Sequence, residues 1–544
     1  MNSSETRDGV VVAVMTLCVY LVAHRSGILS AFVINDDTRQ QIFWMRQYTS
    51  PELYPPSILV AYAKAYVPYG VRALYWLGAM FMDPVQFTKV VAGGLFVLLA
   101  VILSGLGRVF AGRTGAFVAP VVVWLMPFFL NNISGGLSRA FAAPLLALFA
   151  LGLVRERLWM VVTALLVMAI CIPYIWVLAA LASGLGYLAG LISRKWRPIF
   201  PSTWWHLGIL GCMALPVWMF KHAMDTMGFG PLAGRADMTG PHGSILPLYT
   251  QAGRFEILPL PNPFIDLIYR PFEKIGLFLD VGLVAGIISL IVLAPFLVMG
   301  WRWVDWKRVG HKARPLIFLG LSSLLLYCVA RWVVVKLFVP DRYVQYSVNI
   351  AYALGFTVLF SALMSQWKVR RQVKVVLLAV CCVAGMVRLS GESLYDYRGD
   401  RALTHAVLDT PVTSVFAGPP RLLDNVLTFG KRDVLFSFEL AHPWNLGYWH
   451  TIAPRLTETL DALFAESRDA AGRFARKYRV DFMIVDPTWF HDDSAVRSGL
   501  FAPYADQALQ RKQESKRFFF EQDRSLPRII LPDGRSIVDL RPLL

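Results

Sequence analysis

The chain has 544 residues, of which 56% are hydrophobic and 16% charged. Soluble domains are about 45–50% apolar and about 25% charged, so this composition excludes a single soluble core and predicts a membrane protein. The net charge of +17 comes largely from basic residues in short loops between apolar runs, which a membrane topology explains better than a nucleic-acid partner. All six cysteines lie in apolar stretches, so neither a disulfide framework nor a CxxC metal motif is expected.

Long apolar runs recur through residues 1–390. A helix needs about 20 apolar residues to cross a bilayer, and by this measure the sequence predicts about eleven transmembrane helices. The expected spans lie near residues 10–33, 86–107, 115–130, 138–154, 158–172, 174–193, 204–220, 277–299, 315–338, 343–364 and 373–390. The run from Val10 to Phe32 is too long for a signal-peptide core and no small-residue cleavage site follows it, so it is expected to stay as the first span.

The short loops alternate in charge along the chain. The basic loops fall on one side of the predicted membrane and comprise residues 108–113, 155–157, 194–197, 302–314 and 368–374. The opposite loops 131–136 and 173–174 contain no Lys or Arg. Because Lys and Arg accumulate in cytoplasmic loops, the N-terminus is expected in the cytoplasm and segments 34–85, 221–275 and 391–544 outside.

The three outer segments differ in composition. Residues 34–85 contain aromatic-rich amphipathic pieces at 41–48 and 62–82, which suit helices lying in the membrane interface. Residues 221–275 are rich in Gly and Pro and are expected to form a long functional loop.

Residues 391–544 have a globular composition. The pattern predicts strands at 412–417, 434–438 and 482–485, helices at 456–478 and 504–519, and a hairpin around 532–534. Strands that alternate with helices indicate a small, soluble α/β domain. The expected organisation is therefore a transmembrane domain over 1–390 and an extracytoplasmic domain over 391–544.

Two adjacent carboxylates, Asp36 and Asp37, directly follow the first span. One explanation is an N-cap for a helix beginning at Thr38, although capping needs only one acidic residue. The other explanation is catalysis. A carboxylate that is partly desolvated at the outer end of a span has a raised proton affinity and can act as a general base. The second carboxylate would then orient the acceptor or bind a divalent cation.

Basic residues mark a second candidate position on the same side. Lys336 and Arg342-Tyr343 lie at the turn between two late spans, and Arg331 lies inside the preceding apolar run, where a charge is costly. Arginine forms bidentate hydrogen bonds to phosphate. The alternative is structural: the arginine snorkels to the interface and Asp341 caps the next helix.

Two further segments contain candidate substrate contacts. In residues 131–139, small residues precede Arg139 at the start of a span, where a helix N-terminus favours an anion; plain packing by small residues explains the same pattern. In the loop 221–275, Arg235, His242 and Arg254 are each a weak signal alone. The sequence contains no P-loop, HExxH or GxSxG motif.

With these features the chain resembles the GT-C superfamily of polyprenyl-phosphate-sugar-dependent glycosyltransferases. That superfamily includes protein O-mannosyltransferases, lipid A aminoarabinose transferases and oligosaccharyltransferase catalytic subunits. The resemblance covers the whole architecture and rests on the acidic pair, the interfacial helices, the many spans, the turn Pro340-Asp341-Arg342-Tyr343 and the terminal α/β domain. Only the acidic pair is a family motif in the strict sense.

The resemblance implies an inverting transfer of a sugar from a polyprenyl-phosphate donor to a glycan, lipid or protein hydroxyl, at the outer face of a bacterial inner membrane. Asp36 or Asp37 would be the base. The residues expected to bind substrate are Arg139, Arg331, Lys336, Arg342, Tyr343 and His242. No cofactor is certain, and a divalent cation at the acidic pair stays open.

One motif of the superfamily is absent, and two other functions are alternatives to this interpretation. Tyr448-Trp449-His450 is not the WWDYG motif of oligosaccharyltransferases, so peptide N-glycosylation is not expected. A transporter or flippase for a lipid-linked saccharide would show broken segments at corresponding positions of two halves, and the sequence has no such symmetry. A non-catalytic glycan-assembly subunit, in which the acidic pair merely caps a helix, is the third alternative.

Overall fold

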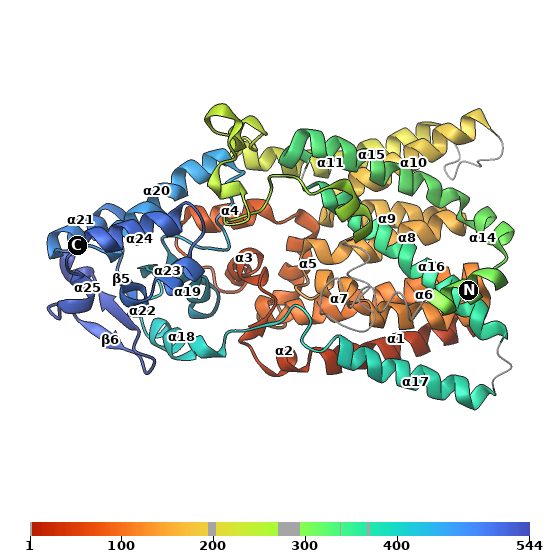
Figure 1. Ribbon diagram of the computed structural model, residues 1–544, viewed down its shortest axis with the longest axis horizontal. Helices are drawn as coiled ribbons and strands as arrows, with labels where there is room; N and C mark the ends of the chain where they lie inside the picture. The colour runs from red at the N-terminus through yellow and green to blue at the C-terminus, as the bar shows by residue number, and fades with distance from the viewer. Residues whose placement is uncertain (1–2, 194–202, 270–293, 338, 367–369) are drawn as a thin grey trace.

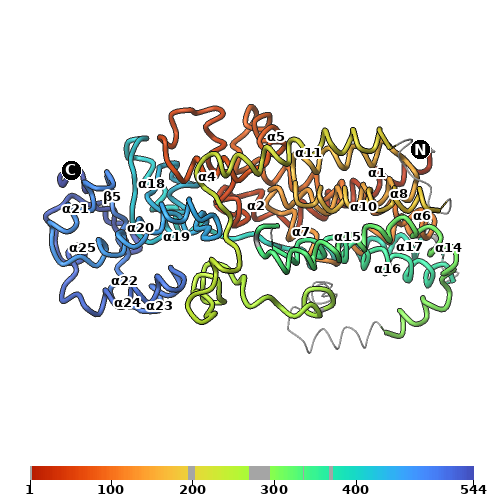
Figure 2. The backbone as a smooth tube through the Cα atoms, turned by 90° about the horizontal axis from the view of Figure 1, so that it is seen from above, coloured from red at the N-terminus to blue at the C-terminus, as the bar shows by residue number. Residues whose placement is uncertain are grey.

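The computed structural model describes residues 3–193, 203–269, 294–337, 339–366 and 370–544. A long helical bundle and a smaller α/β region lie end to end in two perpendicular views (Figures 1 and 2). The N-terminus lies at the far end of the bundle and the C-terminus in the α/β region (Figure 1). The connecting segments of the bundle meet the α/β region in the middle of the molecule.

Six helices among the described residues are long and apolar enough to cross a membrane. They are α1 (Ser3–Ala23), α6 (Pro84–Leu125), α10 (Pro173–Ile192), α11 (Thr203–Thr226), the continuous α14–α15 segment (Trp306–Val333) and α16 (Gln345–Gln366). The other bundle helices are α7 (Pro127–Ile133), α8 (Ala142–Val154), α9 (Leu158–Cys171) and α17 (Arg371–Arg388). Most predicted spans therefore coincide with helices, and residues 277–293 of the predicted span 277–299 lie outside the described part of the chain.

The segment α6 is a helical hairpin rather than one straight helix. The backbone is non-helical at Ala111 and Gly112, and Gly112 has φ +67°, which favours glycine. A Cβ on Gly107 would lie 2.3 Å from the carbonyl oxygen of Gly115, a contact that requires the two halves to run back beside each other. The two halves match the two spans predicted at 86–107 and 115–130.

The first predicted span is wrong at its C-terminal end. Helix α1 stops at Ala23, whose carbonyl accepts a hydrogen bond from the N–H of Gly391, and a short helix α2 (Arg25–Leu29) follows. Strand β1 (Val33–Ile34) then pairs antiparallel with β2 (Tyr395–Asp396). This pairing fixes the chain just before Asp36 against the chain that follows α17.

Charged side chains at the N-terminal end of the bundle join three of the predicted basic loops. Asp8 pairs with Arg113 at 2.9 Å and with Arg108, and Glu5 pairs with Arg155. Lys312 donates a hydrogen bond to the carbonyl of Val109. These loops thus gather at the end of the bundle opposite the α/β region (Figure 1).

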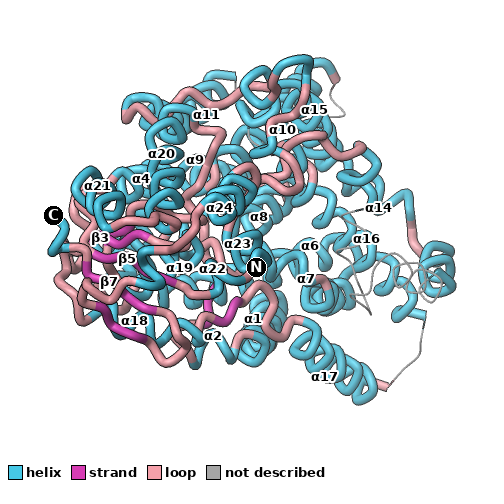
Figure 3. Tube along the Cα trace, turned by 60° about the vertical axis from the view of Figure 1, so that its left-hand side comes forward, coloured by secondary structure: helices cyan, strands magenta, loops and turns pink. Residues whose placement is uncertain are grey.

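The α/β region contains a five-stranded mixed sheet in the order β4-β3-β5-β7-β6, with its strands close together in Figure 3. Its strands are β3 (Val415–Ala417), β4 (Asp433–Val434), β5 (Phe482–Val485), β6 (Arg528–Ile530) and β7 (Ser536–Asp539). Its helices are α18 (Arg401–Leu408), α19 (Pro420–Asn425), α20 (Leu446–Leu463), α21 (Arg468–Tyr478), α22 (Thr488–His491), α23 (Asp493–Gly499), α24 (Tyr504–Glu514) and α25 (Phe519–Gln522). Strand β3 is parallel to β4 and β5, whereas β7 is antiparallel to β5 and β6.

The strand prediction at 482–485 and the hairpin around 532–534 are confirmed as β5 and as the β6–β7 pair. The single helix predicted over 456–478 is wrong, because Ser467 caps a new helix by accepting a hydrogen bond from the N–H of Ala470. The strand predicted at 434–438 ends early at Val434. The N–H of Leu435 still donates to the Phe416 carbonyl of β3 at 2.8 Å. The backbone then leaves the sheet, and the Phe438 carbonyl accepts a hydrogen bond from Arg254 at 2.9 Å.

The first outer segment is only partly interfacial. It forms α3 (Thr38–Gln41), η1 (Phe43–Tyr48), α4 (Ile58–Tyr66) and α5 (Tyr69–Ala79). Helix α5 exposes Trp76 and Leu77, as an interfacial helix would, but the expectation for residues 41–48 is wrong because Phe43 and Trp44 are buried. Arg46 anchors η1 between Asp83 and the carbonyl of Thr428.

The Gly- and Pro-rich loop lies on the α/β region. The N–H of Ala233 donates to the Trp444 carbonyl at 2.7 Å, and the N–H of Ala502 donates to the Ala252 carbonyl at 2.8 Å. The loop therefore has a defined path, along which Arg254 reaches the centre of the molecule.

Candidate functional site

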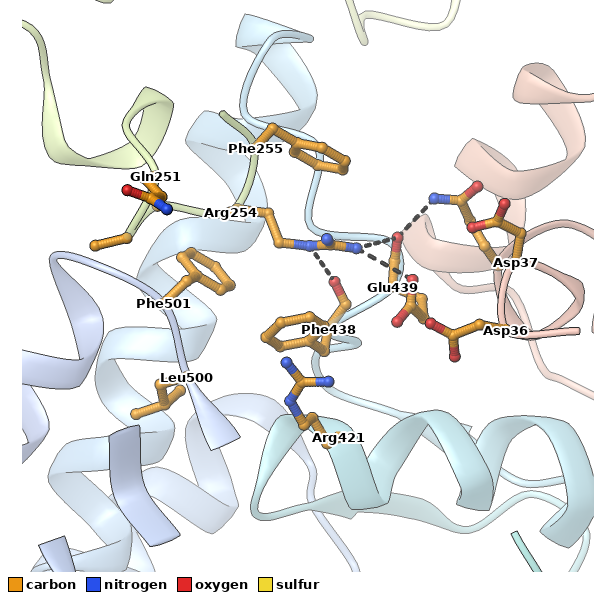
Figure 4. A pocket seen from close by; sticks show the side chains of 13 residues that line it. Asp36, Asp37, Gln251, Arg254, Phe255, Arg421, Phe438, Glu439, Leu500 and Phe501 are labelled. Atoms are coloured by element: carbon orange, nitrogen blue, oxygen red, sulfur yellow. Dashed lines mark hydrogen bonds and ion pairs between the residues drawn. The ribbon is translucent and has the colours of Figure 1, made fainter. Parts of the chain in front are cut away.

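The acidic pair lines a cavity of about 460 Å³ between the bundle and the α/β region. One wall comes from the start of α3, a second from the loop that carries Arg254, and a third from α19, the turn after β4 and the segment between α23 and α24 (Figure 4). The lining residues are Asp36, Asp37, Gln40, Gln251, Ala252, Gly253, Arg254, Phe255, Arg421, Phe438, Glu439, Leu500 and Phe501. The cavity thus joins segments that are hundreds of residues apart in the chain.

Asp36 is held by donors from both parts of the molecule. Its Oδ1 accepts a hydrogen bond from the Tyr397 hydroxyl at 2.5 Å and bonds from the guanidinium of Arg39, including one from Nε at 3.2 Å. Burial alone would raise the pKa of Asp36, but Arg39 and Tyr397 outweigh it and lower that pKa below its usual value. The raised proton affinity expected from the sequence is therefore wrong for Asp36, because its donors stabilise the charged form. Asp36 stays ionised and keeps one orientation, with all these donors on a single oxygen.

Asp37 is held differently. Its Oδ2 lies 2.7 Å from Nη1 of Arg139, and both side chains are about 30% exposed, at 30% and 27%. Asp37 occupies the N-cap position of α3, yet its side chain makes no capping hydrogen bond. The N–H groups of Thr38 and Arg39 donate to the carbonyls of Asn35 and Asp36 instead, so neither carboxylate is explained by helix capping.

The small residues before Arg139 serve close packing at the same place. A Cβ on Gly135 would lie 2.8 Å from Oδ1 of Asn35, the residue that precedes the acidic pair. Gly136 has φ +62°, and a Cβ there would meet the Tyr75 hydroxyl at 2.7 Å. The packing explanation for the segment 131–139 and the position of Arg139 beside Asp37 are thus compatible.

A buried charge network lies behind the acidic pair. Arg39 is 4% exposed and bonds to Asn425 at 3.1 Å and to Glu439 at 3.4 Å, while Asp424 lies 3.8 Å away. On its other oxygen Glu439 pairs with Arg254 at 3.2 Å. Burial and the neighbouring Asp424 carboxylate raise the pKa of Glu439, and burial also raises that of Asp424.

Arg139 and Arg342 lie on the bundle side of the acidic pair. Both guanidinium groups and Asp37 act on the Tyr66 hydroxyl: burial raises its pKa to about 12, Asp37 adds to the rise, and Arg342 and Arg139 oppose it. The pKa of Arg342 itself is raised, because Tyr346 and Asp341 beside it outweigh the effect of burial. Arg139 therefore pairs with Asp37 where α8 begins, and Arg342 acts on Tyr66 from the position where α16 begins.

The remaining predicted substrate contacts have other surroundings. Arg331 bonds to the Pro261 carbonyl at 2.7 Å and pairs with Asp266 at 3.5 Å. The buried Tyr343 donates its hydroxyl to the Leu337 carbonyl. Lys336 lies exposed near Gly234, and His242 is exposed on a turn of the loop with φ +60°. Neither these four residues nor Arg139 and Arg342 line the cavity beside the acidic pair.

Several residues of the site were missed by the sequence analysis. Arg39, Tyr397, Arg421 and Glu439 carry no motif and lie far apart in the sequence. Arg254 was a candidate substrate contact, but the sequence did not predict its ion pair with Glu439. A signal for Arg39 was present in its position three residues after Asp36, which puts an arginine and a carboxylate on one face of a helical turn.

The donor set at the acidic pair does not suit a divalent cation. Among the described residues, no group of three or more His, Cys, Asp or Glu side chains is placed to hold a metal ion. Arg39 pairs with Oδ1 of Asp36 and Arg139 with Oδ2 of Asp37, so each carboxylate already has an arginine cation as its counter-charge. No step of a reaction is therefore assigned to a metal.

Comparison with solved structures identifies the architecture. ArnT from Cupriavidus metallidurans in the apo state matches with a TM-score of 0.53 and 12% identity over 98% of both chains. The same protein bound to undecaprenyl phosphate matches with 0.50 and 12% over 97% of both chains. The chain has a GT-C fold.

The apo oligosaccharyltransferase of Archaeoglobus fulgidus also matches, with a TM-score of 0.50 and 12% identity over 93% of this chain and 73% of the other. No protein-family model and no curated protein sequence matches the chain. The resemblance to GT-C proteins is thus confirmed at the level of the fold, with the apolar helices of an integral membrane protein.

Proposed function

We propose that this protein is a GT-C-type glycosyltransferase that moves a sugar from a polyprenyl-phosphate donor to a hydroxyl acceptor, with inversion at the anomeric carbon. The supporting observation is the cavity between bundle and α/β region, which the acidic pair lines, together with Arg139 of the bundle, which pairs with Asp37. The acceptor is a glycan, lipid or protein.

Asp36 is the general base in this proposal. Asp36 is ionised and is oriented by Arg39 and Tyr397. It also lines the cavity in which the acceptor would bind. A base must reach the acceptor hydroxyl at about 2.6–3.2 Å while the acceptor oxygen faces the anomeric carbon at about 3–3.5 Å. Transfer of that proton to Asp36, attack by the oxygen and departure of the phosphate invert the anomeric carbon in one displacement.

Arg139 and Arg342 bind the phosphate of the donor. Guanidinium groups form bidentate, charge-assisted bonds to phosphate, and these two begin spans at the end of the bundle where a lipid headgroup would lie. ArnT, which shares the fold, has been seen with undecaprenyl phosphate. Asp37 positions Arg139 through their ion pair until the phosphate arrives.

The orientation belongs to the same proposal. The basic loops gathered around Asp8 and Glu5 face the cytoplasm, because Lys and Arg are retained there. Residues 391–544 then form a domain outside the inner membrane of a bacterium, and the cavity opens at the outer face. About eleven helices cross the bilayer, counting the α6 hairpin as two.

The test measures donor binding and transfer separately. Undecaprenyl phosphate is titrated into the purified protein, and transfer is measured in membranes supplied with undecaprenyl-phosphate hexoses and pentoses. Asp36→Asn is expected to reduce transfer more than about 100-fold, within the range for loss of a general base, while leaving undecaprenyl phosphate binding intact. Arg139→Gln and Arg342→Gln are expected to weaken that binding about tenfold or more.

The matched control is Asp506→Asn, since Asp506 is an exposed aspartate whose side chain is 67% accessible. Full transfer by the Asp36→Asn variant would overturn the proposed mechanism. Undecaprenyl-phosphate sugar that binds the wild type, crosses the membrane and is never transferred would identify a carrier instead.

A further inference from the structure

The wall of the cavity next to the α/β region is cationic and aromatic. The guanidinium of Arg421 lies 3.9 Å from the centre of the Phe438 ring, and that of Arg254 lies 4.5 Å from the same centre. Phe438 is thus positioned between the two arginines, with Phe501 close by (Figure 4). Such an arrangement holds both guanidinium groups in place through cation–π contacts.

The two arginines differ in how their charge is balanced. Arg254 is tied to Glu439 by an ion pair and donates Nε to the Phe438 carbonyl. Arg421 donates Nε to the Ser498 carbonyl at 2.7 Å, and no carboxylate of the described residues lies within ion-pair distance of it. The side chain is exposed, so its terminal N–H groups are available to a ligand in the cavity.

The charge of Arg421 acts on the Asp36 carboxylate. Burial raises the pKa of Asp36, Arg39 lowers it most strongly, and Arg421 adds to the lowering. Arg421 also lowers the pKa of Arg254, after the larger effect of burial, because the two cations repel each other. An anion placed beside Arg421 would relieve this repulsion.

The position of this cation separates it from the donor. Arg139 and Arg342 lie where spans begin, which suits a phosphate attached to a lipid in the membrane. Arg421 lies on α19 of the α/β region and lines the cavity with the acidic pair (Figure 4), and α19 lies farther from the bundle than α3, which follows that pair (Figure 1). A second anion is therefore expected to arrive with the acceptor rather than with the donor.

We propose that Arg421 and Phe438 form a subsite for an anionic saccharide acceptor, whose carboxylate or phosphate is a group other than the attacking hydroxyl. This inference rests on the proposed function. Phe438 holds the Arg421 guanidinium at the cavity wall through its cation–π contact, and Arg421 binds the anion. The saccharide then presents its hydroxyl to Asp36 on the opposite wall.

The experiment titrates three saccharides into the full-length protein in detergent: trigalacturonic acid, which carries carboxylates, glucose 6-phosphate, and neutral maltotriose. The wild type is expected to bind at least one anionic probe about tenfold or more tightly than maltotriose, as one charge-assisted bidentate contact provides. Comparison of the two anionic probes distinguishes a sugar acid from a sugar phosphate.

Arg421→Gln is expected to abolish the preference and Arg421→Lys to retain part of it. Arg497→Gln, at an exposed arginine of α23, is the control and should bind like the wild type. Equal binding of maltotriose, a preference that survives in Arg421→Gln, or binding of neither anionic probe at millimolar concentration would overturn the inference.

The outcomes distinguish this inference from the proposed function. Undecaprenyl phosphate binding and the loss of transfer in Asp36→Asn do not depend on Arg421. If both are observed while the anion preference is absent, the glycosyltransferase proposal stands and only the acceptor class is wrong.

Discussion

Asp36 and Asp37 are adjacent in the sequence but have different partners in the structure. Asp36 is held by Arg39 and Tyr397 in a buried network, whereas Asp37 forms an ion pair with Arg139 at the bundle. The donors lower the pKa of Asp36 although burial opposes them. The proposed mechanism accordingly gives these two identical side chains different roles: Asp36 is the base, and Asp37 positions Arg139.

Tyr397→Phe tests how Asp36 is held. Removing the hydroxyl takes one donor from the charged carboxylate, so the pKa of Asp36 rises and the acid limb of the pH–rate profile moves to higher pH. The rate at neutral pH is expected to fall about fivefold, as for the loss of one hydrogen bond of about 1 kcal/mol. The pH dependence of transfer is measured for both proteins.

Tyr395→Phe is the control for this variant, because Tyr395 is two residues away and 52% exposed. An acid limb that does not move in Tyr397→Phe would show that Asp36 is not the group whose ionisation governs the rate.

At the scale of elements, the acidic pair is positioned by contacts between loops rather than by one helix. The β1–β2 pair fixes the chain before Asn35, and Asn35 donates its side-chain amide to the Ser393 carbonyl at 3.0 Å. The segment after α7 approaches from the other side, where Gly135 leaves room for Asn35. Small residues in that segment thus set the distance between Asp37 and Arg139.

Gly135→Ala is expected to impair the site, since its Cβ would lie 2.8 Å from Asn35 Oδ1. Overpacking of this kind costs about 1–3 kcal/mol, so a lower midpoint of thermal unfolding and a several-fold loss of transfer are expected. Gly94→Ala is the matched control, because no atom lies within 4 Å of a Cβ there. Equal behaviour of the two variants would contradict the close approach.

At the scale of the whole molecule, the site exists only where the bundle meets the α/β region. Arg39 and Arg46 from the first outer segment bond to Asn425 and to the Thr428 carbonyl, and Arg254 from the second bonds to Glu439. Removing one partner of a buried ion pair leaves an uncompensated charge, so these contacts keep the three segments together. The walls of the cavity come from the first outer segment, the second outer segment and the α/β region, so none of these segments forms it alone.

The orientation of the molecule can be checked with fusions at its C-terminus. Alkaline phosphatase, which is active only outside the cytoplasm, is expected to be active when fused after Leu544, and green fluorescent protein at the same position to stay dark. Fusions after Arg157, in a basic loop, should give the reverse pattern. Active phosphatase at Arg157 together with fluorescence at Leu544 would invert the topology and place the cavity at the cytoplasmic face.

The sequence by itself determined the class of protein, most of the helices and the acidic pair. Apolar runs and the alternation of short strands with helices are local properties, so the helical bundle, β5 and the β6–β7 hairpin were predictable. The boundary of the first span was not, because Ala23 ends its helix through a hydrogen bond to the distant Gly391.

The tertiary structure alone decided which charged groups meet. Arg39 and Arg421 lie in helices of four and six residues, and Tyr397 and Glu439 lie outside helices and strands, so no periodic pattern marks them. Their partners are up to about 400 residues away in the chain. Burial and ion pairing, which set the pKa of Asp36, arise only when these segments pack together. The same packing separated the cations predicted from sequence, because it pairs Arg139 with Asp37 and Arg331 with Asp266.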